Sequence, residues 1–124
     1  MRFHSGSKLH IELTTDAQAS LTEAESHVPD TQAACKAQLR RLLQRLAETG
    51  TLQSPEQWNT EGGGFFAVKT RCGLRAYGWY HAHRRGVFVV SHFIYKKRQK
   101  LDPADIDRAE RNRRRLYESE KYGH

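Results

Sequence analysis

The chain has 124 residues, of which 37% are hydrophobic and 28% charged, and its formal charge at neutral pH is +7. This length suits one domain with one core, and the absence of any run of about 18 apolar residues argues against a membrane-spanning helix. Residues 69–124 hold 15 of the 21 lysines and arginines but only six of the 14 acids, which favours a polyanionic partner over the alternative of a merely solvated basic helix.

The first half of the chain predicts one strand followed by helices. KLHIELTT, residues 8–15, alternates Leu9, Ile11 and Leu13 with polar residues, as a strand with one buried face does. Residues 16–28 carry helix-forming residues as far as the proline at position 29, which disfavours helical geometry in the residue before it. A longer amphipathic helix is expected over residues 31–50, with a stop at Gly50 and an apolar face made of Leu39, Leu42, Leu43 and Leu46.

The second half predicts three sequential strands and a final helix. SPEQW, residues 54–58, has the Ser-Pro start of a short helical turn, which EGGG then ends. The strands are FFAVKTR, LRAYGWYH and VFVVSHFIY, with turns at residues 72–73 and 83–86. Asp102 as N-cap and Pro103 at the first helical position open the last helix, whose expected core residues are Ile106, Ala109, Leu116 and Tyr117. The sequence therefore predicts a single α+β domain over residues 1–124, with an antiparallel sheet of three to four strands, N-terminal helices packed on one face and a C-terminal helix.

Alternation along these strands gathers cations on one surface. Lys69 and Arg71 share a face of the first strand, and Arg75, Tyr77 and Trp79 share a face of the second. A hairpin turn at residues 72–73 brings the two groups together, although like charges on neighbouring strands repel by up to about 1 kcal/mol. We therefore expect an anion to bind there.

The third strand ends in a basic loop. His92 is expected to share a face with Phe88 and Val90, which favours a hydrogen-bonded histidine at the edge of the core, with a catalytic or phosphate-contacting role as the alternative. Tyr95 could cap the core or stack on a base. The loop that follows carries Lys96, Lys97, Arg98 and Lys100.

Cysteines and histidines give no sign of a metal or another cofactor. Cys35 and Cys72 stand in different predicted elements without a CxxC partner, so we expect two ordinary thiols. His81 and His83 form an HxH pair without an acidic cluster nearby, which indicates surface histidines. The opening MRFHSGSKLHIEL lacks the apolar stretch of a secretory signal, and a cytoplasmic location is expected by default.

Two stretches of the second half match the pattern of a known family. VKTRCGLRAYGWY is similar to a strand ending in a basic residue that turns into one with an early arginine and a final aromatic pair. GVFVVSHFIYKKRQKLDPADIDRAERNR is similar to the family's next strand, double lysine, polar loop and helix, on Phe93, Lys96, Lys97, Gln99, Lys100, Pro103, Ile106 and Ala109. On these residues the chain resembles the RelE/ParE superfamily of bacterial toxins, most closely its HigB-like, phage-associated branch. The resemblance covers about residues 31–117, and residues 1–30 form a less typical N-terminal extension.

The resemblance implies the toxin of a type II toxin–antitoxin system, held inactive by a protein antitoxin. HigB-like and RelE-like members cleave messenger RNA in the ribosomal A site, whereas ParE-like members inhibit DNA gyrase, so the fold does not choose the target. A third alternative is a basic nucleic-acid-binding module without catalysis. For a metal-independent ribonuclease, the catalytic candidates are Arg75, Arg71, Lys69, His92 and Tyr95, and the RNA-binding candidates are Lys96, Lys97, Arg98, Lys100 and Tyr77.

Overall fold

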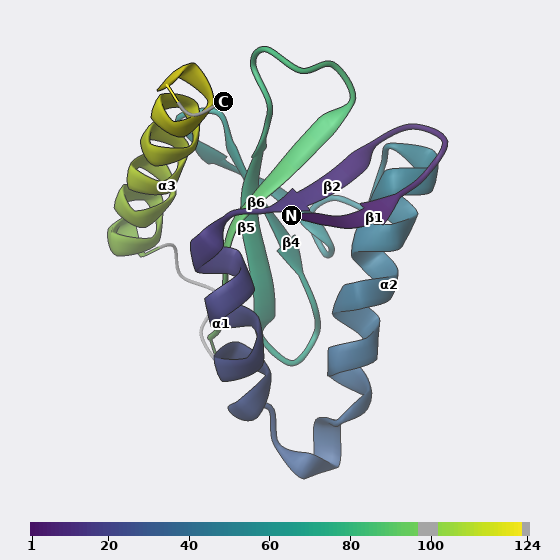
Figure 1. Cartoon of the computed structure of the whole chain (residues 1–124). Coiled ribbons are helices and arrows are strands. Elements are labelled where there is room, and N and C mark those ends of the chain that lie inside the picture. Colours follow the sequence, from purple (N-terminus) through teal and green to yellow (C-terminus); the bar gives the residue numbers. More distant parts are fainter. Residues whose placement is uncertain (97–101, 123–124) are drawn as a thin grey trace.

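One mixed β-sheet organises residues 1–96 and 102–122, the part of the chain that the computed structural model describes (Figure 1). Its strands are β1 (Arg2–Ser5), β2 (His10–Leu13), β3 (Trp58–Gly62), β4 (Phe65–Lys69), β5 (Leu74–Tyr80) and β6 (Val87–Tyr95). Across the sheet their order is β1-β2-β6-β5-β4-β3. β2 runs parallel to β6, and the other neighbouring pairs are antiparallel.

The prediction of an antiparallel sheet of three to four strands is therefore wrong. The three strands of the second half do form the expected meander, but β2 adds to β6 in the parallel sense, with Ile11 opposite Phe88 and both side chains fully buried. Alternation of apolar and polar residues indicates a strand but not its direction, because either direction buries the same face. β1 is short and polar, so it carries no such signal.

A third feature of the sheet was missed, the hairpin of β3 and β4. Residues 54–57 do form a turn, where the sequence predicted a helical turn for SPEQW, but a strand that was not predicted begins directly after it at Trp58. Gly62, Gly63 and Gly64 have φ angles of 86°, 63° and 82°, a left-handed backbone that glycine adopts without a steric penalty. The glycines thus form a tight turn that pairs the two strands, and the Trp58 ring stacks on Phe66 with centroids 4.8 Å apart.

Two helices cover one face of the sheet. α1 (Thr15–Ser26) begins at Thr14, whose hydroxyl accepts a hydrogen bond from the Ala17 amide at 3.0 Å. A 3-10 turn (Asp30–Gln32) leads into α2 (Ala34–Thr49), which ends at Gly50 with a φ of 79°. The four leucines of α2 are buried as predicted, and they pack with residues of α1 and of β2, β4, β5 and β6 in the main core.

The C-terminal helix α3 (Pro103–Tyr122) packs on the opposite face, and Figure 1 shows it across the sheet from α2. As predicted, Asp102 caps this helix, because its carboxylate accepts from the Ala104 amide at 2.9 Å. A second, smaller core lies beneath α3 and consists of Phe65, Trp79, Val87, Val89 and Ala109. Within the described ranges, no helix has both the length and the apolar character that crossing a membrane requires.

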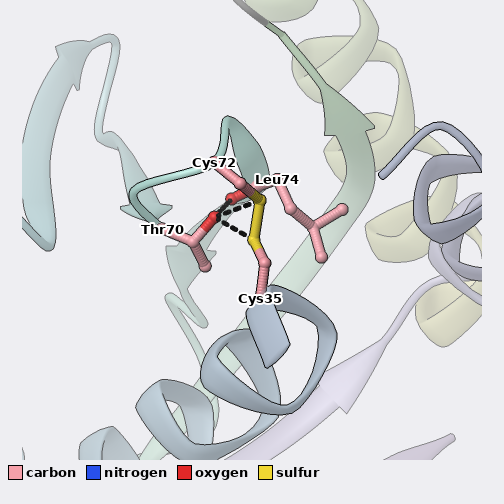
Figure 2. Close-up of a disulfide and its surroundings, with 4 residues drawn as sticks. All are labelled: Cys35, Thr70, Cys72 and Leu74. Atoms are coloured by element: carbon pink, nitrogen blue, oxygen red, sulfur yellow. Dashed lines mark hydrogen bonds between the residues drawn. A yellow bond between two sulfur atoms is a disulfide. The ribbon is translucent and has the colours of Figure 1, made fainter. Parts of the chain in front are cut away.

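Cys35 and Cys72 form a disulfide, so the expectation of two ordinary thiols is wrong (Figure 2). Cys35 lies in the first turn of α2, and Cys72 lies in the turn between β4 and β5. Their Cα atoms are 6.2 Å apart, although 37 positions separate the two residues in sequence. The spacing of two cysteines carries no pairing information, and only the docking of α2 on the sheet brings them together.

Candidate functional site

Charged and polar side chains gather on the α3 face of the sheet, where β4 ends and β5 begins. Lys69 lies opposite Arg75 in the β4–β5 register, and Arg75, Tyr77 and Trp79 share this face, as alternation predicted. Glu61 at the end of β3 interacts electrostatically with Arg75 and Lys69. We call this group the charged cluster; it consists of Glu61, Lys69, Arg75, Tyr77, His92, Lys96 and Asp105.

His92 joins this cluster because of a β-bulge. Gly78 pairs with Val90 but Tyr77 pairs with His92, so Ser91 is an extra residue in β6. The expectation that His92 shares a face with Phe88 and Val90 is therefore wrong, since the bulge reverses the alternation after Val90. The His92 ring stacks on Tyr77, with centroids 5.3 Å apart.

Both nitrogens of His92 have hydrogen-bond partners. Nδ1 lies 2.8 Å from the Ser91 hydroxyl, and Nε2 lies 3.3 Å from Oδ1 of Asp105. The second carboxylate oxygen of Asp105 lies 2.8 Å from Nζ of Lys96. Burial tends to raise the pKa of Asp105, but hydrogen bonds from His92 and Lys96 hold it below its usual value. Asp105 therefore joins the start of α3 to β6 as a carboxylate.

A second set of polar contacts fixes α3 over the cluster. The Arg108 guanidinium donates to both carboxylate oxygens of Asp16, at 2.7 and 2.6 Å. Asn112 donates to Asp16 at 2.8 Å and to the hydroxyl of Ser91 at 2.9 Å. These bonds join α3 to α1 and to the bulge of β6, so contacts with two elements hold α3 in place over the cluster.

Burial is the main cause of the pKa shifts of three cluster residues, and the neighbouring charges modify them. Burial raises the pKa of Glu61, against the opposing pull of Arg75 and Lys69. Burial and the nearby Arg75 guanidinium lower the pKa of Lys69. Burial also raises the pKa of Tyr77, with Arg75 opposing. The pKa of Glu61 is thus raised and that of Lys69 is lowered, the directions that favour proton transfer by a carboxylate and an ammonium group.

Access to the cluster is uneven. Arg75 is 2% exposed, and Tyr77 and His92 are fully buried. Lys69 is half-buried at the rim, whereas the Lys96 ammonium is buried against Asp105. A polymer that reaches this surface therefore meets Lys69 first, and the buried residues lie behind it.

The remaining candidates lie elsewhere. Arg71 is exposed in the turn after β4, where it and Lys69 line a polar hollow of about 500 Å³. Tyr95 packs against the main core on the opposite face, with its ring 6.5 Å from that of His27. Lys97, Arg98 and Lys100 lie outside the described residues.

The sequence did not identify several residues that build the site. Asp105 lies in the first turn of α3, where an acid is favourable in any helix, and nothing in its spacing pairs it with His92. The sequence did contain one signal for the bulge at Ser91, because a small polar residue interrupts an apolar strand there. Nothing in the sequence indicated Glu61, which directly precedes the three glycines. Its place in the cluster depends on β3, a strand that was not predicted.

The HxH pair lies at the other end of the sheet. His81 is buried, and the expectation of two surface histidines is wrong for it. Its Nδ1 accepts from the amides of His83 and Arg84, both at 3.0 Å, and its Nε2 lies 2.7 Å from the Glu120 carboxylate. Among residues 1–96 and 102–122, no group of three or more His, Cys, Asp or Glu side chains is arranged to hold a metal.

No protein-family model matches the chain, and no curated protein matches it.

Proposed function

We propose that this protein is a RelE/ParE-type toxin that cleaves messenger RNA in the ribosomal A site, in the cytoplasm, and is held inactive by a protein antitoxin. One observation carries the proposal. Lys69 and Arg75 lie opposite each other on β4 and β5, and Glu61, whose pKa is raised by burial, interacts electrostatically with both. This arrangement supports a phosphate-binding surface with a carboxylate available for proton transfer. Phosphate binding and proton transfer are the two functions that RNA cleavage without a metal requires.

The reaction can be assigned to these side chains step by step. The 2′-hydroxyl of the RNA attacks the adjacent phosphorus, and Glu61 takes its proton. The bond from phosphorus to the 5′-oxygen then breaks, and Lys69 gives that oxygen a proton. Lys69 stabilises the extra negative charge on the phosphorane, and the field of the buried Arg75 and Lys96 side chains adds to its effect. The products are a 2′,3′-cyclic phosphate and a free 5′-hydroxyl.

The buried residues act through the lysines and Arg75. Asp105 holds Lys96 by an ion pair of 2.8 Å, and His92 holds Asp105 in turn. Tyr77 stacks on His92 and lies close enough to Arg75 to interact with it. In this proposal Tyr77, His92 and Asp105 are positioning residues, because their burial keeps them from the RNA.

The two carboxylates also explain how the cations stay together. Glu61 and Asp105 offset the repulsion between Lys69, Arg75 and Lys96, so the cluster is stable without a bound anion. A binding module would need only exposed cations. The pairing of an upshifted carboxylate with a downshifted lysine supports catalysis over that alternative.

Expression in bacteria without a partner protein tests the proposal. Wild type should arrest growth, and primer extension should locate cuts in messenger RNA at in-frame A-site positions. Glu61→Gln and Lys69→Met should each lower the rate at which the protein cleaves messenger RNA in purified ribosome complexes by about 100-fold or more. Arg41→Ala removes an exposed cation on α2, away from the cluster, and should leave cleavage unchanged.

Other outcomes would identify the rival functions. Relaxed plasmid DNA with intact messenger RNA would indicate gyrase inhibition. RNA binding without cleavage, unaffected by Glu61→Gln, would indicate a binding module. Either result would overturn the ribonuclease assignment.

A further inference from the structure

The disulfide fastens α2 to the turn between β4 and β5, and this turn borders the charged cluster. Figure 2 shows Thr70 and Cys72 of the turn beside Cys35 of α2. The Thr70 hydroxyl lies 3.0 Å from the Cys35 sulfur and donates to the Leu74 carbonyl at 2.8 Å. The turn is thus joined to α2 by one covalent link, and the Thr70 hydroxyl closes the turn beside it by bonding to the Leu74 carbonyl.

The same turn positions Lys96. The Lys96 amide donates to the Gly73 carbonyl at 2.8 Å. Gly73 has a φ of 106°, and a Cβ atom there would collide with the Lys96 carbonyl, so the two backbones are in direct contact. The turn also carries Arg71, which with Lys69 lines the polar hollow. A shift of the turn would therefore move cations on both sides of the cluster.

We propose that the Cys35–Cys72 disulfide is a reversible redox switch that fixes these cations when it is formed and releases them when it is reduced. The inference rests on the proposed function, since a protein that acts on messenger RNA works in a reducing compartment, where disulfides are rare and mostly transient or redox-sensing. Cys72 is half-exposed while Cys35 is buried, so an external thiol reaches the Cys72 sulfur first.

Reduction proceeds by thiol–disulfide exchange with a small thiol such as glutathione. A glutathione thiolate attacks the Cys72 sulfur, the disulfide bond breaks, and Cys35 leaves as a thiolate that takes up a proton. A second glutathione thiolate attacks the sulfur of the bound glutathione, and Cys72 leaves as a thiol after protonation. Two glutathiones are oxidised to glutathione disulfide, and the protein gains two electrons and two protons. Oxidation by glutathione disulfide reverses each step.

The test compares the purified full-length protein after equilibration with glutathione disulfide and with reduced glutathione, at a temperature where circular dichroism shows both forms folded. Thiol titration gives the redox state, and fluorescence anisotropy gives the affinity for a labelled single-stranded RNA. We expect reduction to weaken RNA binding about five-fold or more, because the binding geometry is then populated only part of the time. The double variant Cys35→Ser, Cys72→Ser should have the weaker affinity under both conditions.

NMR supplies a readout that does not depend on RNA. The Lys96 amide signal should shift on reduction, whereas the His10 amide, which bonds to the Gly86 carbonyl at the other end of the sheet, should not. Equal RNA affinity in the two redox states, an unmoved Lys96 signal, or a disulfide that millimolar glutathione leaves intact would each overturn the switch. If neither form binds the labelled RNA or cleaves messenger RNA on ribosome complexes, but the Lys96 signal still shifts, the coupling of disulfide and cluster stands and the proposed function fails.

Discussion

Breaking the Cys35–Cys72 disulfide should lower the free energy of unfolding by about 4 kcal/mol at 25 °C. The two cysteines are 37 positions apart, and closing a loop of that length in the unfolded chain removes about 13 cal/mol/K of entropy in the chain-entropy treatment. For a protein of 124 residues, that loss corresponds to a fall of about 15 °C in the melting temperature. This value is an upper bound if the unfolded chain keeps residual structure.

Urea unfolding of the oxidised and the reduced protein measures this difference directly. The reduced wild type is the cleaner comparison, because serine in place of the buried Cys35 adds the cost of a desolvated hydroxyl. The m-value should rise on reduction, since the released chain exposes more surface when it unfolds. A change of less than about 1 kcal/mol, with the disulfide shown to form, would refute the assumption that the cross-link acts on a disordered unfolded chain.

Two further predictions concern the turn and the cluster. Gly73→Ala should destabilise the protein by about 3 kcal/mol or more in urea unfolding, because a methyl group would collide with the Lys96 carbonyl. Gly50→Ala, at a φ of 79° but with the added methyl group at ordinary contact distance from Lys8, should lose only about 1–2 kcal/mol. Equal losses would contradict the close contact at Gly73. The folded-state pKa of Asp105 lies below its usual value of 3.8 despite burial, because His92 and Lys96 stabilise the carboxylate. Its contribution to stability is therefore complete above the usual value and is lost as the pH falls through the lower folded-state value. Wild type should lose more stability than Asp105→Asn on acidification from about pH 5, as followed by urea unfolding at each pH, and identical acid profiles would show that these partners do not stabilise the carboxylate.

Local features of the fold could be predicted from the sequence, because they depend on residues close together in the chain. The apolar face of α2, its stop at Gly50 and the cap at Asp102 follow from spacings of one or two helical turns. The pairing of Lys69 with Arg75 follows from a short turn and from alternation. These features were correct.

Features that depend on distant partners were missed. The parallel pairing of β2 with β6 and the disulfide join segments that only the complete fold brings together. The Ser91 bulge changes the face of His92, since one inserted residue reverses the alternation of every residue after it. The site was consequently predicted as cations together with His92, Tyr77 and Tyr95. Its two carboxylates, Glu61 and Asp105, came only from the tertiary structure.

The place of β6 in the sheet has a consequence for how the protein is made. β6 is the last strand to be synthesised, yet it lies between β2 and β5. Until residue 95 has left the ribosome, β2 and β5 each present an open edge to other chains. The sheet therefore cannot be completed during most of translation. The helix α3, which completes the charged cluster, is synthesised later still. A protein that acts on translating ribosomes would on this account become active only after its own synthesis is finished.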